Sequence, residues 1–133
     1  MSWAGMNLLE KQRDPLTYAV IGASIEVHRA LGPGLMESAY EECLCHELFL
    51  RSLSFKRQVP IPLVYKKIHL ECAYYADLVV HDKLVLELKA IENVAKIHEA
   101  QLLTYMKLLG LKKGLLINFH APVLKDGIIR RVL

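Results

Sequence analysis

Two acidic residues and one lysine lie in otherwise apolar segments of this chain, and their types and spacing could support metal chemistry. Asp77 lies within Ala73–Val80, while Glu87 and Lys89 lie within Leu84–Ala90. Both segments are rich in residues that favour β-strands. Because side chains alternate along a strand, we expect Glu87 and Lys89 to share one face.

The short polar connection between these segments, His81-Asp82-Lys83, predicts a β-hairpin. If the hairpin turns about Asp82, Asp77 lies directly opposite Glu87, with their Cβ atoms about 5 Å apart. A shift of the register by one residue would turn one carboxylate to the other face. The convergence of the two carboxylates therefore depends on the position of the turn.

Two facing carboxylates in a half-buried site repel each other unless one is protonated or a cation lies between them. Mg²⁺ commonly binds one or two carboxylates together with water and phosphate oxygens. Such an ion activates a bound water and offsets charge on a phosphoryl group, and Lys89 could orient that water or stabilise the same charge. From the residues alone, a solvated hairpin face with a cross-strand ion pair stays open as the alternative.

Two helices are expected before these strands. Asp14-Pro15 is a typical helix start, and the chain from about Leu16 to Leu31 has apolar residues at mostly helical spacing. Gly32-Pro33-Gly34 ends this helix. A second helix is expected from about Met36 to Leu53.

The rest of the chain predicts strands and one further helix. We expect strands at Gln58–Tyr65, His69–Val80, Leu84–Ala90, Leu115–Phe119 and Ile128–Val132, and a helix at Val94–Leu109 that Gly110 ends. Pro60 and Pro62 place the first strand at an edge of the sheet, and Lys66-Lys67 is expected to be a turn. The order is ααβββαββ, which predicts an α/β fold with a mixed β-sheet flanked by helices.

Length and composition describe an ordinary globular protein. The chain has 133 residues, with 53% hydrophobic and 23% charged, so we expect one domain over residues 1–133 with residues 1–14 as an N-terminal extension. No apolar run approaches the roughly 18 residues needed to cross a bilayer, and the first residues lack the pattern of a signal peptide. We therefore expect a cytoplasmic protein with no membrane partner.

The net charge bears on a nucleic-acid partner, and the number of cysteines bears on metal cofactors. The formal net charge of +3 permits a nucleic-acid partner but does not require one. Cys43, Cys45 and Cys72 are too few for a zinc or iron–sulfur site with four ligands.

Several motifs in order carry a resemblance to a known family. Gly34-Leu35-Met36-Glu37-Ser38-Ala39-Tyr40 reads G-x-x-E-x-x-Y, the signature of the GxxExxY proteins. Further matching motifs lie at Gln58–Pro60, Tyr75–Val80, Glu87–Ala90, His98–Tyr105 and Gly114–Phe119. The resemblance covers almost the whole chain, from about Tyr18 to Arg131. That family is similar to the RecB-like and Cas4-like branch of the PD-(D/E)xK nuclease superfamily.

The resemblance implies a restriction-endonuclease-like core with a metal site on its central hairpin. It implies that Asp77 and Glu87 bind the metal, that Lys89 is the catalytic lysine, and that Glu37 adds an acidic group from an early helix. Gln101 and Tyr105 match a Q-x-x-x-Y element that lies near the active site and the nucleic-acid strand. The expected protein is a nuclease that depends on Mg²⁺ or Mn²⁺ and hydrolyses phosphodiester bonds, with DNA favoured over RNA.

This sequence departs from the family pattern at two points. Ala76, not proline, precedes Asp77, a change that touches no ligand. The four cysteines of the iron–sulfur site in Cas4-like enzymes are absent, so their accessory chemistry does not carry over.

Non-catalytic interpretations stay open for the chain and for single residues. The chain could be a catalytically silent nuclease-fold module that binds nucleic acid or protein partners, and such a module could be a homo-oligomer. Glu37 could serve only to interact with the dipole of its helix. Tyr40 and His98 are expected to serve packing more than chemistry.

Overall fold

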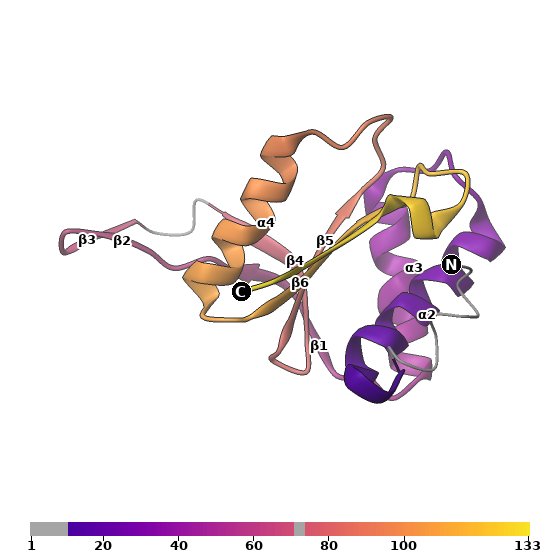
Figure 1. The fold of residues 1–133 in the computed structure, drawn as a ribbon, viewed down its shortest axis with the longest axis horizontal. Helices are drawn as coiled ribbons and strands as arrows, with labels where there is room; N and C mark the ends of the chain where they lie inside the picture. Colours follow the sequence, from indigo (N-terminus) through magenta and orange to yellow (C-terminus); the bar gives the residue numbers. More distant parts are fainter. Residues whose placement is uncertain (1–10, 71–73) are drawn as a thin grey trace.

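A five-stranded mixed sheet lies at the centre of the fold, between helices on its two faces (Figure 1). The computed structural model describes residues 11–70 and 74–133. The strands are β1 (Phe55–Pro60), β4 (Tyr75–Val80), β5 (Leu84–Lys89), β6 (Lys113–Asn118) and β7 (Ile128–Val132), in the spatial order β1-β4-β5-β6-β7. Only β5 and β6 run parallel, and helix α4 connects them. The other neighbouring strands are antiparallel.

Helices α2 (Pro15–Leu31) and α3 (Glu37–Leu50) pack on one face of this sheet. The side chain of Asp14 caps α2 by accepting the N–H of Thr17 at 3.2 Å. Both helices contribute to a core with the sheet side chains that point the same way, including Leu78, Leu86 and Leu88. Residues on the α2–α3 face of β5 therefore have even numbers.

Helix α4 (Lys96–Leu109) covers the other face, where Leu102, Tyr105 and Met106 pack against Val79 and Val85. Gly110 ends the helix in the left-handed conformation, with φ of 70° and ψ of 26°. By alternation, Glu87 lies on the same face of β5 as Val85, the α4 side of the sheet. Asp77 instead turns its carboxylate toward the neighbouring strand, where it accepts the N–H of Leu88.

The helices and the main sheet confirm the expected order ααβββαββ. The structure adds a two-stranded ribbon, β2 (Leu63–Tyr65) and β3 (Ile68–Leu70), that projects beyond α4 in Figure 1. The expected strands Gln58–Tyr65 and His69–Val80 were therefore each too long, because each spans part of the main sheet and part of this ribbon. The strand signals on both sides of each break are alike, so the sequence pattern does not reveal the breaks.

The ribbon turn, the edge strand and the end of α3 each had a sequence-based expectation. The turn at Lys66-Lys67 is confirmed, since both residues take positive φ angles, 45° and 72°, as in two-residue hairpin turns. The edge position of β1 is also confirmed. The expected second helix was too long at its end: α3 stops at Leu50 because Ser52 takes a φ of 59° and the N–H of Leu53 turns back to the carbonyl of Leu48.

A 3₁₀ turn at Leu124–Gly127 leads into β7. No helix in the described ranges is long and apolar enough to span a membrane. Cys72 lies outside the described residues, while Cys45 is buried and Cys43 exposed.

Candidate active site

The β4–β5 hairpin has the register that brings Asp77 and Glu87 together. The paired residues are Leu78 with Leu86, Val79 with Val85, and Val80 with Leu84. This is the arrangement expected for a turn about Asp82, which takes a φ of 55°. The same register extended by one residue places Asp77 opposite Glu87.

Beyond Leu78 and Leu86, the side chains of Asp77 and Glu87 themselves connect the two strands. The N–H of Asp77 donates to Oε1 of Glu87 at 3.2 Å, and the N–H of Leu88 donates to Oδ2 of Asp77 at 2.8 Å. Each carboxylate is held by the backbone of the opposite strand. The direction of both acidic groups is therefore set by the hairpin.

Ionising both carboxylates, Asp77 and Glu87, costs free energy in the folded protein. Glu87 is only 5% exposed, and burial followed by the charge of Asp77 raises the pKa of Glu87 to about 8. Burial also raises the pKa of Asp77, against the opposing effect of the N–H of Leu88. A cation beside the two groups would favour their charged forms and lower both pKa values.

The chemistry of this pair fits a small hard cation. Backbone N–H groups occupy Oε1 of Glu87 and Oδ2 of Asp77, which leaves Oε2 of Glu87 and, beside the amide of Gln58 at 3.4 Å, a lone pair on Oδ1 of Asp77 to a ligand. Within residues 11–70 and 74–133, no three His, Cys, Asp or Glu side chains gather closely enough to hold a metal by themselves. A Mg²⁺-type ion needs no more than one or two carboxylates, because water and phosphate oxygens complete its shell.

Lys89 stands at the end of β5, beside both carboxylates. Its positive charge opposes the rise that burial causes in the pKa values of Asp77 and Glu87. The side chain is half-buried and lines a groove of about 560 Å³ with Tyr74 and residues of α4. Lys89 thus connects the acidic pair to a space that a substrate could enter.

Gln101 and Tyr105 lie on the face of α4 that borders this groove. Nε2 of Gln101 donates to the hydroxyl of Tyr105 at 2.9 Å, so the two side chains lie together on this face. Burial and then the charge of Glu87 raise the pKa of Tyr105. His98 is also on this helix, but its Nδ1 accepts the N–H of Ala95 at 2.9 Å, which agrees with a structural role.

Glu37 lies near the acidic pair without forming a group of three with it. Its Oε1 accepts the N–H of Ala90 at 3.3 Å, and its charge contributes to the raised pKa of Glu87. Tyr40, one turn further along α3, is fully buried and stacks on Phe119 with ring centroids 4.5 Å apart. Tyr40 therefore has the packing role that was expected.

Two residues near the site had no expected role. Glu41 lies one helical turn after Glu37, its side chain is only 13% exposed, and its charge raises the pKa of Asp77. Gln58 donates from Nε2 to Glu41 at 2.8 Å and to Asp77 at 3.4 Å. The i, i+4 spacing of Glu37 and Glu41 could have indicated Glu41, whereas Gln58 was marked only by the matching motif Gln58–Pro60, which assigned it no role.

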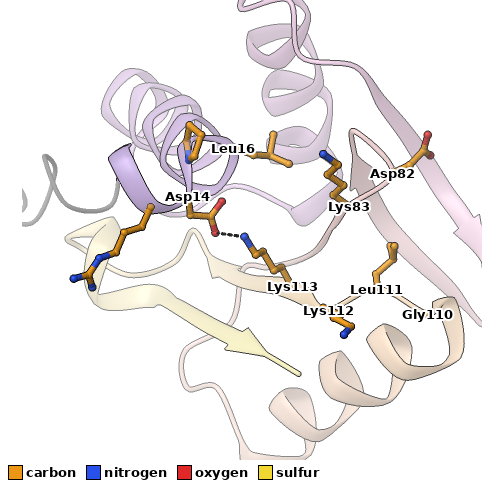
Figure 2. Close-up of a pocket in the computed structure, with 10 residues that line it drawn as sticks. Asp14, Leu16, Asp82, Lys83, Gly110, Leu111, Lys112 and Lys113 are labelled. Atoms are coloured by element: carbon orange, nitrogen blue, oxygen red, sulfur yellow. Dashed lines mark ion pairs between the residues drawn. The ribbon is translucent and has the colours of Figure 1, made fainter.

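A second pocket, of about 520 Å³, lies at the other end of the sheet (Figure 2). Lys83 and Lys113 line it at the starts of β5 and β6, whereas Lys89 ends β5, roughly 16 Å further along the strand. Asp14 points toward Lys113 there and forms an ion pair with it at 3.1 Å. This pocket is separate from the acidic pair.

Comparison with known protein families identifies the family to which this fold belongs. A model of the PD-(D/E)XK nuclease superfamily matches residues 14–132, nearly the whole chain. The comparison with curated proteins found no match, and neither did the comparison with solved structures. The five-stranded mixed sheet flanked by helices agrees with the fold of that superfamily, which implies nuclease activity. The chain belongs to the PD-(D/E)XK nuclease superfamily.

Proposed function

We propose that this protein is a nuclease that depends on Mg²⁺ or Mn²⁺ and hydrolyses phosphodiester bonds, with DNA as the favoured substrate. The observation that carries the proposal is the pair of buried Glu87 and partly buried Asp77, with Lys89 beside it at the edge of a groove. A sheet interior has no structural need for such a pair, because burying charges without a cation costs free energy.

In the proposed site, Asp77 and Glu87 bind the ion through the oxygens that the backbone leaves available. The bound ion supplies an acidified water and offsets charge on the phosphoryl group. Lys89 stabilises the growing negative charge on the phosphoryl oxygens and orients the attacking water. Glu37 adds negative charge at the rim, where it can hold a water of the metal shell.

Gln101 and Tyr105 are proposed to contact the nucleic-acid strand. Both line the groove that Lys89 also lines, and their mutual hydrogen bond fixes the ring and the amide relative to each other. An aromatic ring and an amide suit a base and a phosphate–sugar backbone respectively. We assign Gln101 a role close to the reacting phosphate as well.

The finer classification is part of the proposal. The G-x-x-E-x-x-Y motif at Gly34–Tyr40 and the Q-x-x-x-Y element at Gln101–Tyr105 favour a GxxExxY protein of the RecB-like and Cas4-like branch. The preference for DNA rests on that branch. The family match begins at residue 14, which favours one nuclease domain preceded by an N-terminal extension.

Cleavage assays test the proposal. Wild-type protein with Mg²⁺ or Mn²⁺ should cleave DNA, and a chelator should stop it. Glu87→Gln and Lys89→Ala should each lower the rate by at least about 100-fold, because the first removes a charged ligand of the ion and the second removes the positive charge that stabilises the reacting phosphate. Glu87→Gln keeps the acceptor for the N–H of Asp77, so its fold should persist by circular dichroism.

The control for these variants is Lys83→Ala, which changes an exposed lysine at the start of β5, away from the acidic pair. Its cleavage rate should equal that of wild type. No metal-dependent cleavage of single-stranded DNA, double-stranded DNA or RNA by wild-type protein would refute the enzymatic proposal.

A catalytically silent module is the second candidate, and the β2–β3 ribbon favours it. Val64, Tyr65 and Ile68 are each more than half exposed on this projecting ribbon. Exposed apolar side chains on a two-stranded ribbon are typical of a surface that binds a partner. Size-exclusion chromatography with light scattering tests self-association, and binding of a labelled oligonucleotide by protein that does not cleave would favour this candidate.

A further inference from the structure

Gln58 has a backbone conformation that is unusual for its place in the fold. It lies in the middle of β1 with a φ of 48°. Its neighbours pair regularly with β4, Arg57 with Leu78 and Val59 with Ala76, while Gln58 itself is left out of the pairing opposite Asp77. A residue other than glycine is strained in this left-handed region.

Other non-glycine residues with positive φ have an ordinary local reason. Among the described residues, Ser52 follows the end of α3, Lys66 and Lys67 form the ribbon turn, and His81 and Asp82 form the β4–β5 turn. Gln58 reverses no chain direction and ends no helix. Its strain must therefore be compensated by contacts of the residue itself.

Those contacts lead to the acidic pair. Nε2 of Gln58 donates to Oε1 of Glu41 at 2.8 Å and lies 3.4 Å from Oδ1 of Asp77. A side-chain amide carries two N–H donors, so one amide can serve both carboxylates. Gln58 thus bridges helix α3 and strand β4 at the residue proposed to bind the ion.

The neighbouring arginine holds the other side of Glu41. Nη2 of Arg57 donates to Oε2 of Glu41 at 2.7 Å and to Glu42 at 2.8 Å. Glu41 is therefore engaged at both oxygens, by Arg57 and by Gln58. This carboxylate serves as an anchor for the Gln58 amide, while the guanidinium offsets its charge.

We propose that Gln58 is a positioning residue, which uses its strained backbone to fix the plane of the Asp77 carboxylate for binding the divalent cation. The N–H of Leu88 holds Oδ2 at 2.8 Å and the Gln58 amide contacts Oδ1 at 3.4 Å, so the two contacts together restrict the rotation of the carboxylate. Oδ1 keeps a second lone pair for the cation. This proposal rests on the proposed nuclease function, because the strained backbone of Gln58 would serve the metal site of that nuclease.

Substitution by glycine separates positioning from structural support. Glycine adopts positive φ without strain, so Gln58→Gly should keep the fold, with an unfolding temperature equal to or above that of wild type. Loss of the amide should weaken Mn²⁺ binding, measured by titration calorimetry, by about 10- to 100-fold, as is usual for groups that orient a metal ligand. Lys67→Gly, at a φ of 72° in the ribbon turn, is the matched control and should leave Mn²⁺ affinity unchanged.

A second readout does not depend on metal. In crystals grown with a chelator, the Asp77 carboxylate should have one orientation in wild-type protein and more than one in Gln58→Gly. A variant that keeps both its Mn²⁺ affinity and a single Asp77 orientation overturns the proposal, as does one that only loses stability. If wild-type protein binds no Mn²⁺, the nuclease proposal fails, and the orientation of Asp77 still decides the role of Gln58.

Discussion

At the scale of single residues, the acidic pair determines how the hairpin behaves without metal. Asp77 and Glu87 approach each other because each accepts an N–H from the opposite strand. Their backbone contacts offset part of the cost of burial, but burial and mutual repulsion still raise both pKa values. The metal-free protein is thus expected to hold an extra proton at neutral pH.

This extra proton gives stability a definite pH dependence. The pKa of Glu87 rises from 4.5 in the unfolded chain to about 8 in the fold. Between these values the folded state binds more protons than the unfolded state, so the free energy of unfolding of metal-free protein should fall as pH rises from about 4.5 to 8. Urea unfolding in the presence of a chelator measures this dependence.

Glu87→Gln is the matched variant for that experiment, since it removes the titrating group and keeps the shape. Its free energy of unfolding should depend less on pH over the same interval, and it should exceed that of wild type at pH 8. Equal pH dependence in the two proteins would mean that Glu87 does not carry the extra proton.

At the scale of elements, the turn before α3 shows how a motif residue can serve the fold. The hydroxyl of Tyr40 donates to the carbonyl of Gly32 at 2.6 Å and accepts the N–H of Leu35 at 3.2 Å. The tyrosine of the G-x-x-E-x-x-Y motif thus fixes the connection between α2 and α3. That connection sets where α3 begins, and with it the place of Glu37.

Tyr40→Phe tests this role. The variant keeps the ring that stacks on Phe119 but leaves the carbonyl of Gly32 and the N–H of Leu35 without their partner. The free energy of unfolding should fall by about 1–3 kcal/mol. DNA cleavage at a temperature where the variant is folded should stay within a few-fold of wild type, and a complete loss of cleavage would point to a direct chemical role.

The elements also show what the sequence could and could not predict. The hairpin register followed from the turn at His81-Asp82-Lys83, because a short turn leaves few ways to pair the strands. The ribbon between β1 and β4 did not follow, since its strands resemble those of the main sheet. The position of Gln58 beside Asp77 depends on a backbone conformation that tertiary contacts impose, and no sequence pattern encodes it.

At the scale of the whole molecule, several basic side chains form ion pairs within the fold. Arg57 binds Glu41 and Glu42, Arg131 pairs with Glu99, and both Lys113 and Arg130 pair with Asp14. Lys66 and Lys67 instead lie exposed at the tip of the ribbon. Among the described residues that line the groove, Lys89 is the one lysine or arginine, so it is the side chain there that can attract a phosphate.

Asp14 connects distant parts of the chain, and its removal should be costly. It is 3% exposed, caps α2 through Thr17, and pairs with Lys113 of β6 and Arg130 of β7. Asp14→Ala should lower the free energy of unfolding by about 1–2 kcal/mol, as expected for the loss of a helix cap.

The control is Lys56→Ala, which removes the ion pair of Lys56 with Asp82. The side chains of both residues are more than two-thirds exposed. Exposed pairs contribute little, so its stability should stay close to that of wild type. An Asp14 variant as stable as this control would show that the contacts of Asp14 do not connect α2 to the sheet.

Titration calorimetry with Mn²⁺ tests the central claim most directly, because it measures the site without needing the right substrate. Wild-type protein should bind Mn²⁺ and release protons as Glu87 ionises, and Asp77→Asn should weaken binding by at least about tenfold. Absence of binding, or binding unchanged by Asp77→Asn, would contradict a metal site at this hairpin.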